Sequence, residues 1–232
     1  MLARAYQARG EYTKAIEKAN EVINSGKFRL LEFSSIDQSE TSVDKLFSDE
    51  HVFALRNREL GNYSTALHHT KVSGGVTSFA PLPFDNVASM YESNNDDVRY
   101  AKWFDLGSFT KFLSDSTNVY YPKMAMIKLS EMYLLVAECS YHKNPAQSLK
   151  SINELRNHRI RNNQEWTSIT QSYIFDEMKR EYVGEGQMWY VYKRNNLNLP
   201  GNNISGGIMA DDKYYVFPLP DAEIEDGRRN QR

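Results

Sequence analysis

Cysteine is almost absent from the sequence. Cys139 is the only one in 232 residues, so no disulfide can form within the chain and the redox compartment cannot be inferred from pairing. An excess of basic residues is also missing, because 28 lysines and arginines stand against 30 aspartates and glutamates. Binding to a phosphate backbone needs such an excess, so we expect no nucleic acid partner. No apolar run is long enough for a signal peptide or a membrane span.

The common motifs of catalysis and metal binding are missing as well. The sequence contains neither a GxxxxGK phosphate loop nor a GxSxG nucleophile elbow. No two of its five histidines have the spacing that would place them on one helix face as metal ligands. Asp96 and Asp97 are adjacent rather than alternating, which indicates a helix cap or turn instead of a calcium loop. We therefore expect no metal, no cofactor and no catalytic residue.

Aromatic side chains, in contrast, are abundant. They make up 12% of the chain, with 15 tyrosines, in a composition that is 41% apolar and 25% charged, as in folded proteins. So many rings exceed what a helical core usually needs, and they suit a surface that stacks on sugars or grips a peptide. The alternative is that the rings fill the interior beneath long loops.

Residues 1–25 have the apolar spacing of a helical hairpin. Apolar side chains recur every three or four residues on both sides of a turn at Gly10, and Gly26 follows as a C-terminal cap. The order around the turn resembles a tetratricopeptide repeat, with Gly10, Tyr12, Ala15 and Ala19. One such pair cannot bury its own apolar face, so we expect neighbouring pairs to cover it.

Residues 128–161 predict a second hairpin. The run 132–137 is apolar throughout, while charged residues fall within one narrow stripe of the same helix, at Lys128, Glu131 and Glu138. This helix should be nearly buried with one charged ridge. The next helix has a strong start signal, with Asn144 as N-cap, Pro145 at the first helical position and Gln147 three residues after the cap.

Residues 27–122 are rich in loops. Alternation over 51–56 permits a half-buried extended segment, and glycines and prolines interrupt helical patterns over 57–88. Long loops within a compact domain are usually functional or disordered, and the many rings of this region argue against disorder. We interpret it as a ligand-binding region.

The stretch 174–194, IFDEMKREYVGEGQMWYVYKR, has the densest pattern of charges and rings. Its first part predicts an amphipathic helix, Gly184 and Gly186 interrupt it, and a second short helix follows with Trp189 packed in the core. Glu181 and Glu185 have a spacing at which two carboxylates could act on a glycosidic bond. Carboxylates at helical spacing are commonly surface ion pairs, so we interpret them as scaffold.

Three segments, in order, resemble signatures of the SusD/RagB family of outer-membrane nutrient-binding lipoproteins. The resemblance covers residues 128–232 and is carried by KLSEMYLLVAEC with NELRNHR, by the stretch 174–194, and by a closing segment that begins with YYVFPLP. The signature positions, scaffold residues in the family, are Glu131, Glu138, Asn153, Arg156, Glu177, Arg180, Glu181, Gly184, Glu185, Gly186, Trp189 and Arg194. Lys128 and Met178 stand where the family more often has arginine.

The resemblance implies a mainly α fold of TPR-like helical hairpins, an α/α superhelix, with long irregular loops and minor β structure. Residues 1–232 would form a single SusD-like domain, the C-terminal part of a longer fold. Its parts would be a TPR-like hairpin at 1–26, a loop-rich region that binds the ligand at 27–122 and the family's C-terminal region at 123–232.

The resemblance also implies a function. Such a protein is not an enzyme: it binds an oligosaccharide, or a peptide in some branches, at the outer membrane surface and delivers it to a SusC-like TonB-dependent transporter. Its membrane contact is a lipid on an N-terminal cysteine, for which this sequence has no match. Rings and polar groups in the loop region are the candidate ligand-binding residues: Tyr91, Asn94, Arg99, Trp103, Tyr120 and Tyr121.

Two alternatives remain open from the sequence. An intracellular helical-repeat adaptor that binds another protein through a groove would fit a chain without an export signal. A glycosidase would shorten an oligosaccharide, and its turnover would depend on Glu181. For Tyr91 and Trp103, packing beneath loops is the alternative to a ligand contact.

Overall fold

The computed structural model describes residues 1–33, 44–60, 87–92, 96–105, 108–112, 123–200 and 207–216. The described chain is mainly helical, with short antiparallel strand pairs, which confirms the predicted fold class. By its internal contacts the chain divides into two compact units, residues 1–183 and 184–232. The boundary falls at Gly184, one of the two glycines predicted to interrupt the helix in the stretch 174–194. That the whole chain forms one domain stays a prediction.

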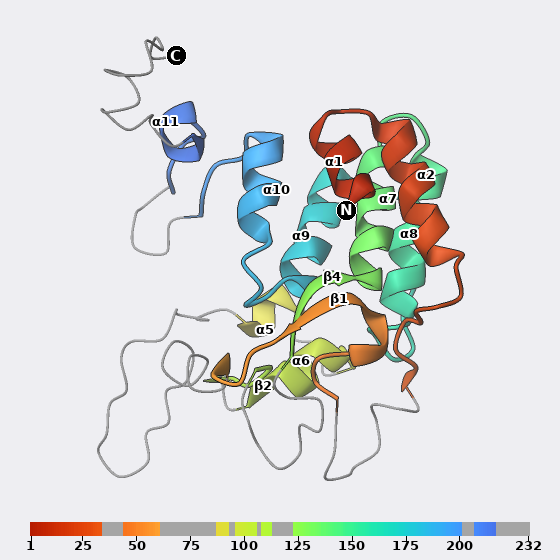
Figure 1. Ribbon diagram of the computed structural model, residues 1–232, viewed down its shortest axis with the longest axis vertical. Helices are drawn as coiled ribbons and strands as arrows, with labels where there is room; N and C mark the ends of the chain where they lie inside the picture. The colour runs from red at the N-terminus through yellow and green to blue at the C-terminus, as the bar shows by residue number, and fades with distance from the viewer. Residues whose placement is uncertain are drawn as a thin grey trace. The chain divides into compact units, whose positions relative to one another are not determined.

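The first unit contains the two predicted helical hairpins and a fifth long helix (Figure 1). The hairpins are α1 (Leu2–Ala8) with α2 (Tyr12–Ile23), and α7 (Leu129–Ser140) with α8 (Pro145–Asn157); the fifth helix is α9 (Gln171–Glu181). Gly10, in the turn between α1 and α2, has a φ of +74°, a conformation that costs glycine little. Asn144 caps α8 as predicted, because its side chain accepts a hydrogen bond from the Gln147 amide at 3.1 Å.

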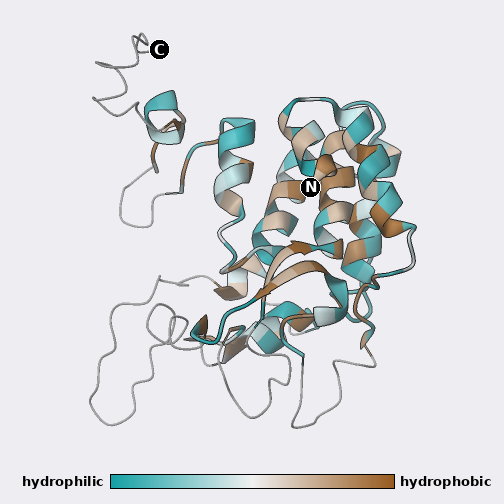
Figure 2. Ribbon diagram, viewed as in Figure 1, coloured by the Kyte–Doolittle hydropathy of each residue, from teal (hydrophilic) through white to brown (hydrophobic). Residues whose placement is uncertain are grey.

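Helix α7 is the centre of this helical layer and packs against α2, α8 and α9. In Figure 2 apolar positions gather where α7 passes between its neighbours. One core cluster there consists of Ala3, Ala15, Ala19, Ile127, Met132, Leu135, Val136 and Cys139. Two residues of the predicted charged ridge face α1: Glu131 forms an ion pair with Arg4, and Glu138 accepts a 2.9 Å hydrogen bond from Gln7. These two residues join the hairpins, whereas Lys128, the third, precedes α7 and reaches Glu181 instead.

A strand pair lies below the helices in Figure 1 and brings distant segments together. β1 (His51–Arg56), which begins directly after a single 3-10 turn η1 (Ser48–Glu50), pairs antiparallel with β4 (Lys123–Lys128). Arg56 lies opposite Lys123, and the register shifts near Phe53. The extended segment expected at 51–56 is thereby confirmed as a strand.

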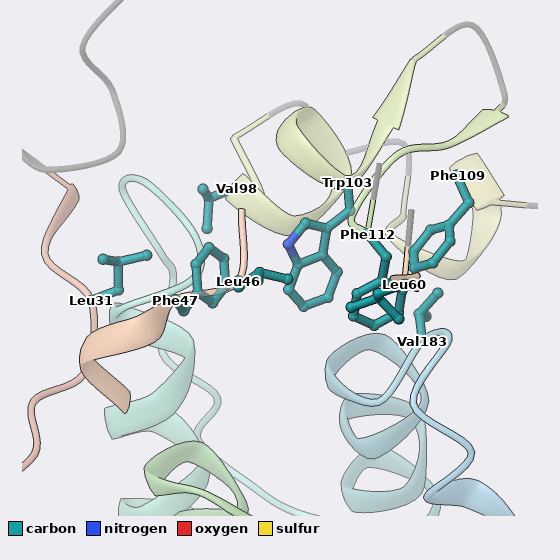
Figure 3. Close-up of a cluster of buried hydrophobic side chains, with 9 residues drawn as sticks. All are labelled: Leu31, Leu46, Phe47, Leu60, Val98, Trp103, Phe109, Phe112 and Val183. Atoms are coloured by element: carbon teal, nitrogen blue, oxygen red, sulfur yellow. The ribbon is translucent and has the colours of Figure 1, made fainter. Parts of the chain in front are cut away.

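A second core cluster is formed by short elements together with the segments that connect elements of the first unit. The short elements are α5 (Val87–Met90), α6 (Val98–Trp103), β2 (Phe104–Asp105) and β3 (Ser108–Phe109). Figure 3 shows Trp103 in the middle of the cluster, with Leu31, Leu46, Phe47, Leu60, Val98, Phe109, Phe112 and Val183 around it. The Trp103 indole donates a 2.7 Å hydrogen bond to the Lys45 carbonyl, and Lys111 Nζ lies 3.6 Å from the ring centroid.

The second unit contains α10 (Met188–Asn195) and the short helix α11 (Asp212–Tyr215). Trp189 on α10 packs on Tyr215 with ring centroids 5.3 Å apart, but 39% of Trp189 is exposed. The prediction of a core tryptophan is wrong here, because the surrounding elements of this unit are too short to enclose an indole. The closing segment begins inside this short helix, because Asp211 caps the helical turn at 212–215. Residues 217–220 lie outside the described residues.

Candidate ligand pocket and its supporting charge network

Helix α9 carries two glutamates, one turn apart, into the interior of the first unit. Glu177 has no exposed surface and lies 2.7 Å from Arg99, 3.0 Å from Arg156 and 3.1 Å from Arg180, measured between carboxylate oxygens and guanidinium nitrogens. The interpretation of carboxylates at this helical spacing as surface ion pairs is therefore wrong for Glu177 and, below, for Glu181. Arg180 is a neighbour of Glu177 on α9 itself, but Arg99 and Arg156 come from α6 and α8, which lie too far along the chain for helical periodicity to reveal them.

Glu181 is enclosed in the same way. Arg159 donates two hydrogen bonds of 3.0 Å to it, from Nε and Nη2, and Lys128 Nζ lies 3.3 Å away. Arg159 also reaches Glu50 at 2.7 Å, so it connects the end of α8 with the start of β1. A lysine at 128 makes one contact with this carboxylate oxygen, where a guanidinium could make two.

Asp97 completes this charge network, which we define as Glu50, Asp97, Arg99, Lys128, Arg156, Arg159, Glu177, Arg180 and Glu181. Asp97 caps α6 by accepting a hydrogen bond from the Arg99 amide at 2.9 Å, as its position in the sequence predicted. Its carboxylate also pairs with the Arg99 guanidinium at 2.7 Å. One aspartate thus starts a helix and neutralises a buried arginine.

The charges of the network stabilise one another. Burial by itself would raise the pKa of Glu177, but Arg99, Arg156 and Arg180 outweigh it and lower that pKa from 4.5 to about 2. The pKa of Glu181 is likewise held well below its usual value, because Arg159 and Lys128 outweigh the effect of burial. Both glutamates stay ionised at neutral pH, and Glu181 is therefore a poor proton donor for glycoside hydrolysis.

A polar pocket of about 530 Å³ lies at the loop between α8 and α9. Its lining comes mainly from residues 160–168, with Glu92, Asp96, Arg156 and Tyr173 from neighbouring elements. We call it the α8–α9 pocket. Trp166 and Tyr173 lie side by side in it, with ring centroids 4.9 Å apart. The two rings form an apolar patch among amide, carboxylate and guanidinium groups, which is the chemistry of a site that binds hydroxyl-bearing ligands.

The signature residues of α8 hold the tryptophan of this pocket. Asn153 Oδ1 accepts a 3.0 Å hydrogen bond from the Trp166 amide, and Asn153 Nδ2 donates a 2.9 Å bond to the Trp166 carbonyl. Arg156 places its guanidinium carbon 3.9 Å from the centroid of the indole ring. Arg156 also pairs with Glu177, so it belongs to both the pocket and the charge network.

Three of the predicted ligand-binding residues are buried. Arg99 and Trp103 have no exposed surface, and Tyr91 is 2% exposed with its hydroxyl donating to the Arg180 carbonyl at 2.8 Å. A ring or guanidinium without exposed surface cannot stack on a sugar, so we correct the prediction for these three to packing and ion pairing. Asn94, Tyr120 and Tyr121 lie outside the described residues.

Neither Trp166 nor Tyr173 is among the ligand-binding residues predicted from the sequence. A signal was present, because RNNQEW at 161–166 places a run of hydrogen-bonding side chains directly before a tryptophan. Among the signature residues of the second unit, Gly184 and Gly186 have φ of +73° and +69°, the left-handed conformation expected where the helix breaks. Glu185 and Arg194 lie in the same unit.

No helix in the described ranges is both long and apolar enough to cross a membrane. Within those same ranges, histidine, cysteine, aspartate and glutamate side chains form no group of three that could hold a metal ion.

Comparison with protein families gives one match. The model of the SusD family matches residues 67–228, which is more than half of the chain. Among curated proteins, nothing matches.

Several solved structures are similar to the chain. A SusD superfamily protein from Bacteroides thetaiotaomicron is 22% identical with a TM-score of 0.72, and 99% of this chain covers 58% of that one. Surface glycan-binding protein A from Bacteroides uniformis is 17% identical with a TM-score of 0.65, at 97% and 57% coverage. Surface glycan-binding protein A from Bacteroides thetaiotaomicron, in complex with laminarihexaose, is 16% identical with a TM-score of 0.65, at 97% and 60% coverage. The chain thus spans less than two thirds of the length of these proteins.

Proposed function

The chain belongs to the SusD family, and from this premise we propose that it binds a glycan at the outer surface of the outer membrane and delivers it to a TonB-dependent transporter. Two of the similar structures are surface glycan-binding proteins, and one of these holds laminarihexaose. These likenesses support a glycan as the ligand. The proposal goes beyond glycan binding in two respects, namely delivery of the glycan to a transporter and location at the cell surface.

The observation that carries the proposal is the contrast between carboxylates and amides in the first unit. Glu177 and Glu181 are fixed in ion pairs without exposed surface, whereas the pocket beside Arg156 presents rings and amide side chains. Such a site recognises a sugar through stacking and hydrogen bonds, and the two glutamates of α9 are held in buried ion pairs, which removes them as an acid and base for cleavage. This supports binding without turnover.

Binding and turnover can be measured on the same samples. We expect the purified protein to retain oligosaccharides in affinity electrophoresis and calorimetry, while chromatography of the sugar after long incubation shows no shorter products. Turnover that disappears in Glu181→Gln would show instead that the protein is a glycosidase.

Delivery requires a second experiment. Crosslinking in intact cells, followed by purification of the protein, should recover a TonB-dependent transporter. Recovery of cytoplasmic proteins alone would favour the helical-repeat adaptor, and binding of peptides in place of sugars would favour a peptide-importing relative.

A further inference from the structure

We propose that the α8–α9 pocket is the site where this chain binds a neutral oligosaccharide, with Tyr173 and Trp166 as the surface on which a sugar ring stacks. The proposal rests on the proposed function and assigns it a place and a ligand class. The residues of this pocket differ from the ligand-binding residues predicted from the sequence in the loop region, three of which are buried.

The aromatic pair has the exposure that stacking requires. Tyr173 is 42% exposed, and Trp166, which is partly buried, lines the pocket beside it. The ring planes are inclined by 40° at a centroid distance of 4.9 Å, so together they make one angled apolar surface. The C–H faces of a sugar ring fit such a surface, while its hydroxyls point outward to polar neighbours.

The pair is held in place before any ligand arrives. Two backbone hydrogen bonds from Asn153 fix Trp166, and the Arg156 guanidinium packs on its ring. Arg156 is itself fixed by Glu177 at 3.0 Å in the buried charge network. A preformed platform spares the ligand the entropy of ordering these side chains, which favours affinity.

The polar lining suits hydroxyl groups. Asn162, Asn163 and Gln164 supply amides, each of which can donate and accept hydrogen bonds as a sugar hydroxyl does. Asn163 is oriented by donating to Asn157 Oδ1 at 2.8 Å and by accepting from Arg156 Nη2 at 3.4 Å. The pocket volume of about 530 Å³ lies within the range of ordinary ligand sites, roughly 300 to 1,000 Å³.

The charges of the lining are nearly balanced. Arg156 is neutralised by Glu177, and Glu92 pairs with Arg180 at 2.5 Å. The other charged lining residues are one arginine, Arg161, and two carboxylates, Asp96 and Glu165, so the lining has no cationic excess to attract a uronate or a sulfate. A neutral glycan therefore fits better than an acidic one.

The test is a binding assay with neutral glucose hexasaccharides in β-1,3, β-1,4 and α-1,4 linkage, and an oligogalacturonate as the acidic probe. Tyr173→Ala should weaken binding of the preferred neutral hexasaccharide roughly tenfold, as expected for loss of one stacking ring. The matched control is Tyr12→Ala, since Tyr12 on α2 has the same exposed fraction of 42% and does not line the pocket. It should change the affinity by less than about twofold.

Tryptophan fluorescence gives an independent readout. In Trp189→Phe protein the remaining indoles are Trp103, which has no exposed surface, and Trp166, so a change on adding the hexasaccharide reports on Trp166. Thermal unfolding of each variant checks that it is folded.

The outcomes separate the site from the function. Wild-type affinity in folded Tyr173→Ala, together with unchanged fluorescence, would overturn the site and leave glycan binding intact. Failure of the unmodified protein to bind any glycan probe would overturn both proposals. Tighter binding of the oligogalacturonate than of every neutral hexasaccharide would overturn the ligand class, and capture of peptides alone would overturn the site as a sugar site.

Discussion

The interior charge network and the α8–α9 pocket share Arg156, and both contain arginines and carboxylates, yet they differ in access to water. In the network, each carboxylate has guanidinium or ammonium partners within 3.3 Å, and each of these acidic residues is at most 2% exposed. In the pocket, amides and a tyrosine ring remain open. Burial, more than residue type, therefore separates a structural arginine or glutamate from one that can meet a ligand.

The strongest way to test this comparison is to remove one carboxylate from the network. Glu181→Gln keeps the shape of the side chain but removes the negative charge that faces Arg159 and Lys128, so that Arg159 keeps only Glu50. We expect a loss of about 3 to 5 kcal/mol in the free energy of unfolding, measured by urea denaturation. A loss below about 1 kcal/mol would mean that water reaches the site, as it does for exposed ion pairs.

Acid should weaken the network through Glu177. Its pKa of about 2 in the folded protein lies below the ordinary 4.5, so the stability it contributes is present above pH 4.5 and is lost as the pH falls toward 2. The size of this loss is about 3 kcal/mol for this group. The free energy of unfolding, measured by urea denaturation at several pH values between 2 and 4.5, should depend less steeply on pH in Glu177→Gln than in the unmodified protein. Equal pH dependence in the two proteins would mean that another group titrates in this range.

Arg156→Lys probes the residue that both regions share. The ammonium keeps a charge near Glu177 but loses the planar contact with Trp166 and the bond to Asn163. We expect a stability loss of about 1 to 2 kcal/mol and a change in the fluorescence of Trp166. The affinity for sugar should be measured in Arg156→Lys and in Asn153→Ala. If it falls in Arg156→Lys but not in Asn153→Ala, Arg156 contacts the ligand directly rather than acting by positioning the Trp166 ring.

The smallest effect is expected on the outer face of α2. Lys18 pairs with Glu21 at 2.6 Å, but solvent surrounds the pair. Lys18→Ala should leave the thermal midpoint unchanged within error, since exposed pairs contribute little. A clear drop would show that solvent exposure is a poor guide to the strength of ion pairs in this protein.

Local signals in the sequence were sufficient for the two hairpins and for α9, but not for α5 and α6, which lie in the region predicted to be rich in loops. The start of α8 follows from Asn144, Pro145 and Gln147, and the turn at Gly10 from one glycine, because each of these acts within a few residues. The position of Glu177 on a helix was equally predictable. Its burial was not, since Arg99 and Arg156 reach it from other helices.

The candidate site was less predictable for the same reason. Trp103 stands among loop-like sequence and suggested a ligand contact, but Phe47 and Phe109 from other segments enclose it (Figure 3). Trp166 stands in a short polar loop that drew no attention, and its placement depends on Asn153 thirteen positions earlier in the chain. Ring exposure depends on contacts between distant segments, which periodicity does not report.

The pairing of Arg56 with Lys123 has a consequence for the whole segment between them. Because the segment leaves and re-enters the strand pair at paired positions, its two ends are held together whatever its length. Closing a loop twice as long costs only about 0.6 kcal/mol more in chain entropy. Insertions between residues 57 and 122 that spare the buried residues of the second core cluster and of the charge network should therefore leave the helical layer standing.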